Sequence, residues 1–275
     1  MIKNILVPVD ESQYSKAAAN LALEIAKRQK ACISFLAIID KPDIEKSLGP
    51  VPLGGMYYAL KREEKILTEE ETRAKNLVDS FEKLSKKENV PCHLIVREGT
   101  PVEVISDEAK YHDFTVMGLK NFFKYGAKED DDTLEGFIGK AAEPTIAVPE
   151  TFKPIERILI TYDGSWPSAR AIHSFLQLNI WNDKKITLLN ISENKKEADI
   201  LLDRMAHLLE TYDVKFDKVH KYGKPEKIIL NFRKEKDFNL IVMGAHSRDK
   251  LTRFLFGDTT KVLLEKAQVP LFIDH

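Results

Sequence analysis

The stretch NILVPVDESQYSKAA, from Asn4 to Ala18, decides the fold because the chain repeats it as RILITYDGSWPSARA, from Arg157 to Ala171. Three further blocks recur in the same order: REGTPVEVI (97–105) as KYGKPEKII (221–229), DFTVMGLKN (113–121) as NLIVMGAHS (239–247), and PTIAV (144–148) as PLFID (270–274). Ordered recurrence of several blocks indicates a duplicated domain.

Within each half, short apolar runs alternate with helical patterns. In the first half the runs have the length of buried strands, at 5–9, 33–39, 94–96, 115–117 and 145–148. Between the first two runs, one helical face collects Ala18, Leu21, Ala22, Ile25 and Ala26. Strands that alternate with helices form a parallel sheet covered on both faces. We therefore predict an α/β protein with two tandem, open, twisted, Rossmann-like sheets of about five parallel strands each.

The length of the chain and a proline-flanked linker predict two domains. A chain of 275 residues exceeds the usual size of a single domain, and the linker PETFKP (149–154) separates the repeated blocks. We predict an N-terminal domain of residues 1–149 and a C-terminal domain of residues 155–275. The strands that begin at Thr145 and Leu271 should pair about a pseudo-two-fold axis, because unpaired apolar edges are unfavourable.

The halves differ between their second and third strands, where the first half carries an insertion. Its Gly/Pro-rich loop, which includes LGPVPLGG (48–55), leads into a long charged helix. The charged runs of this helix indicate a solvated face. The loop is either a lid over a site or only an insertion.

Composition argues against several functional classes. The formal net charge of -1 gives no field that attracts a polyanion, so nucleic-acid binding is disfavoured. The two cysteines, Cys32 and Cys92, form no CxxC pair and indicate neither a disulfide framework nor a zinc knuckle. We expect them to be buried packing residues, with a redox pair as the alternative. No apolar segment approaches the roughly 18 residues of a membrane span, which predicts a cytoplasmic protein without a membrane partner.

Three features of the repeat carry a family resemblance. They are Asp10 and Asp163 with their following serines, the Val-Met-Gly strand ends at Gly118 and Gly244, and the loop VMGAHSRDKLTRFLFGDTT (242–260). With them the chain resembles the universal stress protein family, in its tandem form, over essentially its whole length. The resemblance implies a fold like that of the adenine nucleotide alpha-hydrolases and a regulatory role in stress. It also implies that ATP, ADP or AMP binds, with Mg²⁺ as a possible companion of the nucleotide, and it places Asp163 near the adenosine.

The residues themselves agree with a phosphate site in the second half. A ligand of an open α/β sheet sits beyond the carboxyl ends of the strands, and glycines with a helix N-terminus present amides to a phosphate. Arg248, Lys250 and Arg253 add positive potential. The predicted nucleotide-binding residues are Tyr162, Asp163, Met243, Gly244, Ser247, Gly257, Asp258, Thr259 and Thr260.

Two residues of that loop keep a second interpretation open. Ser247 stands where the resembled family has a second glycine, and Asp258 stands where it has Ser or Thr. A carboxylate 4 Å from a phosphate costs about 4 kcal/mol at an effective dielectric constant of about 20. The alternative is therefore that the glycines only permit turns and that the tandem fold is a structural or interaction module. A protein partner and a homodimer are compatible with both interpretations.

The first half has lost more of the loop. Asn121 takes the place of the second glycine, and Asp131 and Asp132 take the places of Gly257 and Asp258. Acidic side chains repel a triphosphate, so the first half should not bind ATP. The consecutive acidic residues match no calcium loop and are expected to form a solvated turn.

No enzyme signature supports catalysis. The chain lacks SGGxDS after its first strand and GxxxxGK[ST] anywhere. His246 has no partner carboxylate that the sequence reveals, and an aspartate that ends a strand beside a serine more often caps the next helix than acts as a catalyst. We predict no catalytic residues, no metal ligands and at most very slow ATP hydrolysis.

Overall fold

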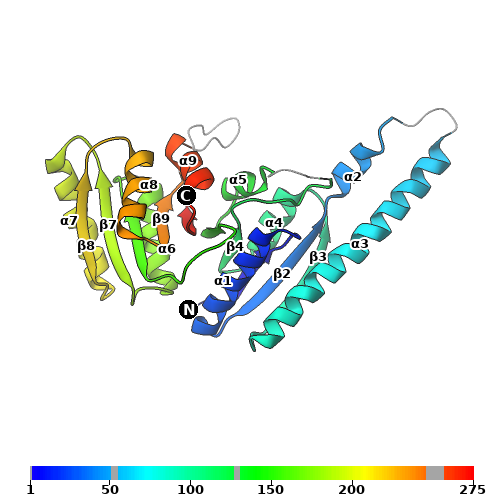
Figure 1. Cartoon of the computed structure of the whole chain (residues 1–275), viewed down its shortest axis with the longest axis horizontal. Helices are drawn as coiled ribbons and strands as arrows, with labels where there is room; N and C mark the ends of the chain where they lie inside the picture. Colours follow the sequence, from blue (N-terminus) through cyan, green and yellow to red (C-terminus); the bar gives the residue numbers. More distant parts are fainter. Residues whose placement is uncertain (1, 51–54, 127–130, 246–256) are drawn as a thin grey trace. The chain divides into compact units, whose positions relative to one another are not determined.

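A computed structural model describes residues 2–50, 55–126, 131–245 and 257–275 (Figure 1). Its internal contacts divide the chain into two compact units, Lys3–Ala142 and Glu143–His275, with Ile2 belonging to the second. Strands and helices alternate in both units, and the strands are mostly parallel. The predicted α/β class is therefore confirmed.

The unit Lys3–Ala142 is built on a parallel sheet in the order β3-β2-β1-β4. Its strands are β1 (Asn4–Pro8), β2 (Cys32–Ile39), β3 (Cys92–Glu98) and β4 (Phe114–Gly118). Its helices are α1 (Gln13–Gln29), α2 (Lys41–Ser47), α3 (Met56–Lys87), α4 (Pro101–Ala109) and α5 (Thr133–Ile138). Strand β1 lies between two neighbours and is buried over most of its length, as its apolar run predicts.

Helix α1 shows how the repeated motif starts a helix. Ser12 is the N-cap, and its side-chain oxygen accepts a hydrogen bond from the amide of Ser15 at 3.1 Å. The helix ends at Lys30, whose backbone is left-handed with φ of 55°. The face predicted to be buried is buried in full, since Ala18, Leu21, Ala22, Ile25 and Ala26 are all at most 1% exposed.

The insertion of the first half forms α2 and α3. The expected long charged helix is confirmed as α3, which buries only Ala74, Val78, Phe81 and Ser85. Phe81 stacks on Phe35 of β2 with ring centroids 5.3 Å apart. Helix α2 was not predicted, and it begins where Asp40 accepts from the amide of Asp43. Residues 51–54 of the loop interpreted as a lid or an insertion lie outside the described residues.

The unit Glu143–His275 repeats the plan with the strand order β5-β10-β9-β6-β7-β8. Its strands are β5 (Thr145–Val148), β6 (Arg157–Thr161), β7 (Lys185–Ile191), β8 (Phe216–Lys221), β9 (Leu240–Gly244) and β10 (Leu271–Asp274). Its helices are α6 (Trp166–Leu178), α7 (Lys195–Thr211), α8 (Pro225–Lys236) and α9 (Asp258–Lys266). In its core, Phe175 of α6 meets Phe272 of β10 edge to face.

Strand β5 ends the first repeat in sequence but packs in the second unit. It runs antiparallel to β10, with Ile146 opposite Phe272. The predicted pairing of the strands that begin at Thr145 and Leu271 is confirmed. Each repeat contributes five strands in chain order, and β5 covers the edge of β10 that would otherwise stay open.

The cysteines start neighbouring strands, as the resemblance implies. Ile33, which follows Cys32, lies opposite Cys92 in the ladder between β2 and β3. Both thiols are free and only half-buried, so the expectation of buried packing residues is wrong. The reason is that β3 is paired only with β2 and is largely exposed. Burial and the nearby Cys92 thiol raise the pKa of Cys32. Within the described ranges no helix is long and apolar enough to cross a membrane.

Candidate functional site

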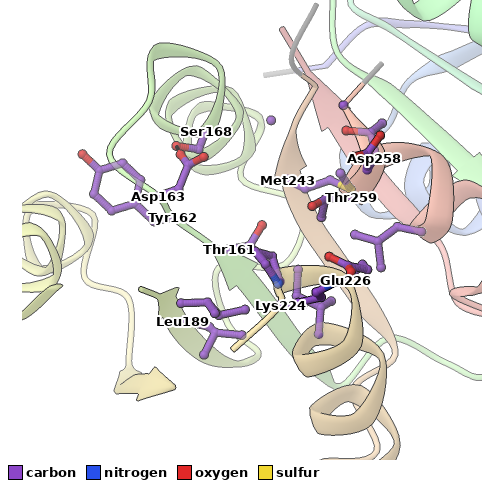
Figure 2. Close-up of a pocket in the computed structure, with 17 residues that line it drawn as sticks. Thr161, Tyr162, Asp163, Ser168, Leu189, Lys224, Glu226, Met243, Asp258 and Thr259 are labelled. Atoms are coloured by element: carbon purple, nitrogen blue, oxygen red, sulfur yellow. Dashed lines mark hydrogen bonds between the residues drawn. The ribbon is translucent and has the colours of Figure 1, made fainter. Parts of the chain in front are cut away.

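A pocket of about 590 Å³ lies at the carboxyl ends of β6 and β9, where parallel α/β sheets place their ligands. It is lined by all the predicted nucleotide-binding residues within the described ranges: Tyr162, Asp163, Met243, Gly244, Gly257, Asp258, Thr259 and Thr260. Figure 2 shows Asp163 and Ser168 beside α6, and Asp258 and Thr259 at the start of α9. Ser247, His246, Arg248, Lys250 and Arg253 lie outside the described residues.

Asp163 fixes the start of α6. Its Oδ1 accepts from the amide of Ser165 at 3.0 Å and from the hydroxyl of Ser168 at 2.7 Å. Ser165 is the N-cap of the helix and accepts from the amide of Ser168. The expected capping role is therefore present. The Asp163 side chain is exposed at the pocket, so capping leaves it accessible to a ligand.

Gly244 is required for packing. A Cβ atom at this position would lie 2.3 Å from the carbonyl carbon of Pro167 and 2.3 Å from the amide nitrogen of Ser168. No side chain fits at such a distance, so the glycine lets the first turn of α6 lie against the end of β9. Gly118 has the same role in the first unit, where a Cβ would lie 2.7 Å from that of Tyr14. The two repeats therefore share a close contact between the first helix and the end of a strand, and this contact shapes the pocket wall.

The start of α9 forms the wall opposite Asp163. Gly257 is its N-cap and offers no side-chain hydrogen bond to the helix. Lys261 is the first residue whose amide bonds back to the N-cap carbonyl, at 3.2 Å. The amides before it belong to the end of the helix that carries partial positive charge and favours an anion. Thr260 is buried at this wall, whereas Asp258 is exposed.

Sequence reasoning missed the wall that α8 contributes. Lys224 is the N-cap residue of α8, and Glu226 lies in its first turn; both line the pocket. The signal was present in the recurring block KYGKPEKII, where the proline after Lys224 marks a helix start. Lys224 is the one cation among the described lining residues.

The pocket also has an apolar side. Leu189 and Ile191 from β7, Met243 from β9, and Ile229 from α8 line it. Tyr162 is half-buried, and its pKa is raised by burial and then by the nearby Asp163 carboxylate. The pocket therefore combines an apolar surface, an acceptor at Asp163 and a positive helix end, which suits a ligand with an apolar ring, hydroxyls and an anionic group.

In the first unit, the loop after β4 closes over the corresponding strand-end aspartate. Asp10 is only 6% exposed. Its Oδ1 accepts from the amide of Ser12 and the hydroxyl of Ser15, as in the second repeat. Its Oδ2 accepts from the amide of Phe122, in the loop after β4. The loop therefore lies over Asp10, whereas Asp163 stays exposed.

Asp131 completes this closure. Its Oδ2 accepts from the amides of Phe123 at 2.9 Å and Lys124 at 3.2 Å, and its Oδ1 accepts from the amide of Thr133 at 2.9 Å. The prediction of a solvated acidic turn is wrong for Asp131, because its carboxylate satisfies loop and helix amides. Asp132 is exposed and forms an ion pair with Lys124. Glu129 and Asp130 lie outside the described residues.

No histidine or cysteine is among the described residues that line the pocket. No group of three or more His, Cys, Asp or Glu side chains that could hold a metal ion occurs among them. Two of the described lining residues, Asp163 and Ser168, are engaged with each other at the start of α6. The arrangement is therefore suited to binding.

Comparisons with known proteins agree with the repeat. The model of the universal stress protein family matches residues 1–120 and 154–275. A universal stress protein of Synechocystis sp. is 21% identical over 98% of this chain and 99% of its own length, and one of Mycolicibacterium smegmatis is 23% identical over 98% and 96%. The crystal structure of a universal stress protein from Archaeoglobus fulgidus shares the fold with a TM-score of 0.73 at 18% identity, covering 98% of this chain and 97% of that one.

Proposed function

The chain belongs to the universal stress protein family, and on that premise we propose that it is a regulatory stress protein that binds one adenine nucleotide in the pocket of the unit Glu143–His275. The observation that carries this proposal is the difference between Asp131 and Gly257, which occupy the same place in the two repeats. In the first repeat the Asp131 carboxylate accepts hydrogen bonds from the amides of Phe123 and Thr133. Gly257 has no side chain that could cap α9 in this way, and an external anion would take the place that the Asp131 carboxylate holds in the first repeat.

The phosphate would meet the start of α9. Helix N-termini bind phosphate through amides that have no partner within the helix, and the helix dipole favours the negative charge. Thr259 and Thr260 line the same wall and carry hydroxyl donors. Lys224 supplies a positive charge from α8. These groups act on the phosphate whatever the base attached to it.

The nucleoside would take the remainder of the pocket. The apolar side at Leu189, Ile191 and Met243 suits a purine ring, which gains from removal of apolar surface from water. The Asp163 carboxylate is exposed beside it and can accept from ribose hydroxyls. A Mg²⁺ ion would enter with a triphosphate, bound chiefly by phosphate oxygens. With no positioned nucleophile and base among the described residues, turnover should be very slow or absent.

The test places the carboxylate of the first repeat into the second. Gly257 has φ of -62°, which any residue adopts, and no described atom lies within 4 Å of a Cβ built there. Gly257→Asp should therefore fold and fill the anion site, and it should weaken ATP and AMP at least about 10-fold in calorimetry with the full chain. Gly257→Asn is the matched control, with similar size and no charge, and should lose less.

The outcomes separate the candidate functions. Binding by the wild type that Gly257→Asp abolishes and Gly257→Asn largely keeps supports a phosphate site at α9. Equal affinity in all three proteins would place the nucleotide elsewhere. If the wild type binds neither ATP nor AMP, and releases no nucleotide when denatured after purification, the interaction module becomes the better explanation of the tandem fold.

A further inference from the structure

The unit Lys3–Ala142 holds a pocket of its own, of about 560 Å³, which nucleotide binding does not explain. It lies at the carboxyl ends of β1 and β2, between α3 and the loop after β4. Its apolar surface comes from Val9, Ala37, Ile38, Leu77 and Phe123, and the aromatic rings of Phe122 and Tyr125 also line it. A cavity of this size with an apolar surface suits a small organic molecule.

The charges of this pocket favour a cation. Among the described lining residues, four carboxylates (Asp10, Glu11, Asp40 and Glu70) face two cations (Arg73 and Lys124), a formal charge of -2. Both cations are already bound. Arg73 donates to Glu11 at 2.8 Å and lies 3.4 Å from Glu70. Lys124 pairs with Asp132, which does not line the pocket. An anion entering here would find both of these cations already engaged by carboxylates.

The backbone donors of the same wall are also engaged. The amide of Phe122 donates to Asp10, and the amides of Phe123 and Lys124 donate to Asp131. The pocket of the second unit has a helix end and threonine hydroxyls at this place, which are donors. The pocket of the first unit therefore presents mainly hydrogen-bond acceptors, and its complement is a ligand rich in donors.

Asp40 is one of two buried carboxylates in this lining, together with Asp10. It is 5% exposed, and it begins α2 by accepting from the amide of Asp43 at 3.3 Å. Burial raises the pKa of this carboxyl, and the bonds that it accepts from backbone amides offset only part of the effect. A buried carboxylate is unfavourable unless it is paired. A bound ammonium group would supply the missing positive charge.

We propose that this pocket binds a small organic cation, an amine on an apolar or aromatic body, with the ammonium group at Asp40 and Glu70. The ammonium group donates hydrogen bonds to carboxylates, which outnumber the cations among the described lining residues. The apolar body of the ligand covers apolar surface of β1, β2 and α3 and so removes it from water. The aromatic residues Phe122 and Tyr125 of the lining favour a nearby cation. The two repeats would then bind ligands of opposite charge.

The test uses three probes that share an indole ring and differ in charge. Tryptamine is a cation, tryptophol carries a hydroxyl in place of the amine, and indole-3-acetate is an anion. In calorimetry with the full chain at physiological ionic strength, tryptamine should bind one saturable site. Tryptophol should bind at least about 10-fold more weakly, and indole-3-acetate should not bind measurably.

Variants of the carboxylates test whether Asp40 and Glu70 bind the ammonium group. Asp40→Asn keeps an N-cap for α2 and should weaken tryptamine at least about 10-fold. Glu70→Gln, at a half-buried position of α3, gives an independent test if Asp40→Asn fails to fold. Asp43→Asn is the matched control, because Asp43 is a neighbouring carboxylate that does not line the pocket, and it should leave affinity unchanged.

Three results would overturn the proposal. They are no binding of tryptamine or of the smaller phenethylamine, equal affinity for tryptamine and tryptophol, and tryptamine affinity that neither Asp40→Asn nor Glu70→Gln changes. Binding of adenosine in preference to the amines would show a pocket for neutral nucleosides instead. The test does not depend on the nucleotide site, because ATP binding at α9 can be measured separately with Gly257→Asp.

Discussion

The two repeats hold pockets of similar size, about 590 Å³ and 560 Å³, at the carboxyl ends of their own strands. Carboxylates outnumber cations among the described lining residues of both, but the two pockets differ in how the nearby backbone amides are engaged. The Asp131 carboxylate accepts from the first amide of α5, that of Thr133, and from two amides of the loop after β4, whereas the same place before α9 is Gly257. The strand-end aspartates differ in the same sense, since Asp10 is buried and Asp163 is exposed. We therefore expect one internal carboxylate to change which ligand the same fold accepts.

The difference also bears on stability. The first repeat satisfies its loop amides with groups of the chain itself, so it does not depend on a ligand for this purpose. In the second repeat the N-cap residue of α9 is Gly257, which has no side chain to cap the helix. A ligand that binds only the folded state raises its stability by mass action. We therefore expect nucleotide to stabilise the second unit and to leave the first unchanged.

The largest expected effect comes from the two strand-end glycines, which the repeats share. Gly244→Ala places a Cβ 2.3 Å from the backbone of α6, and relief requires α6 to move away from β9. Such overpacking costs about 3 kcal/mol of unfolding free energy or more. Gly118→Ala should cost less, because its closest contact is 2.7 Å and involves a side-chain atom of Tyr14. Urea unfolding of the full chain measures both.

The control for this prediction is Gly257→Ala. No described atom lies within 4 Å of a Cβ at Gly257, so the change should alter the unfolding free energy by less than about 1 kcal/mol. Equal losses at Gly244 and Gly257 would contradict the packing role of Gly244.

The next effect concerns the carboxylate that separates the repeats. Asp131→Gly removes the acceptor of three amides, and leaving such groups without a partner costs about 1–3 kcal/mol. Asp132→Asn is the control, because Asp132 forms an exposed ion pair worth less than about 1 kcal/mol. Added sulfate should recover part of the melting temperature that Asp131→Gly loses. In the wild type, sulfate should not stabilise the first unit. No recovery with sulfate would show that these amides cannot hold an external anion.

Much of the fold was predictable because it depends on local signals that recur twice. The alternation of apolar runs with helical patterns gave the parallel sheets, and the serines after Asp10 and Asp163 gave the helix starts. Strand β5 was predictable as a partner of β10 because both are short, apolar and follow a proline. Helix α2 was not predictable, since its Asp40 cap lies in a segment whose glycines and prolines indicate a loop.

The candidate site was predictable only where it follows the chain closely. Asp163, Gly244 and the residues from Gly257 to Thr260 end a strand or start a helix, so topology brings them together. Lys224 comes from a different crossover, and its place beside them depends on tertiary packing. Asp131 was misjudged because charge alone indicates solvent exposure, whereas the three amides that it binds are visible only in the folded loop.

A smaller effect is expected from the buried carboxyl of the first pocket. The pKa of Asp40 in the folded state is raised above its ordinary value, chiefly by burial. The folded protein then binds more protons at this group than the unfolded chain does, so Asp40 lowers stability as pH rises through that pKa. Asp40→Asn should therefore raise the melting temperature at pH 7 and have less effect at pH 4. A lower melting temperature at pH 7 would mean that the charge is needed for capping α2.

The smallest effect is expected at Asp258, where two influences oppose each other. Its carboxylate lies in the first turn of α9, where a negative charge stabilises the helix by about 0.5 kcal/mol, so Asp258→Ser should lower stability slightly. The same carboxylate repels phosphate, but its exposure means that water screens most of this repulsion. Asp258→Ser should therefore tighten ATP by only about three-fold, and AMP by less, because ATP carries more negative charge. Calorimetry with both nucleotides measures the ratio. A gain of 100-fold for ATP would show that Asp258 faces the phosphates at close range, and that the second pocket, like the first, carries a carboxylate that limits its ligand.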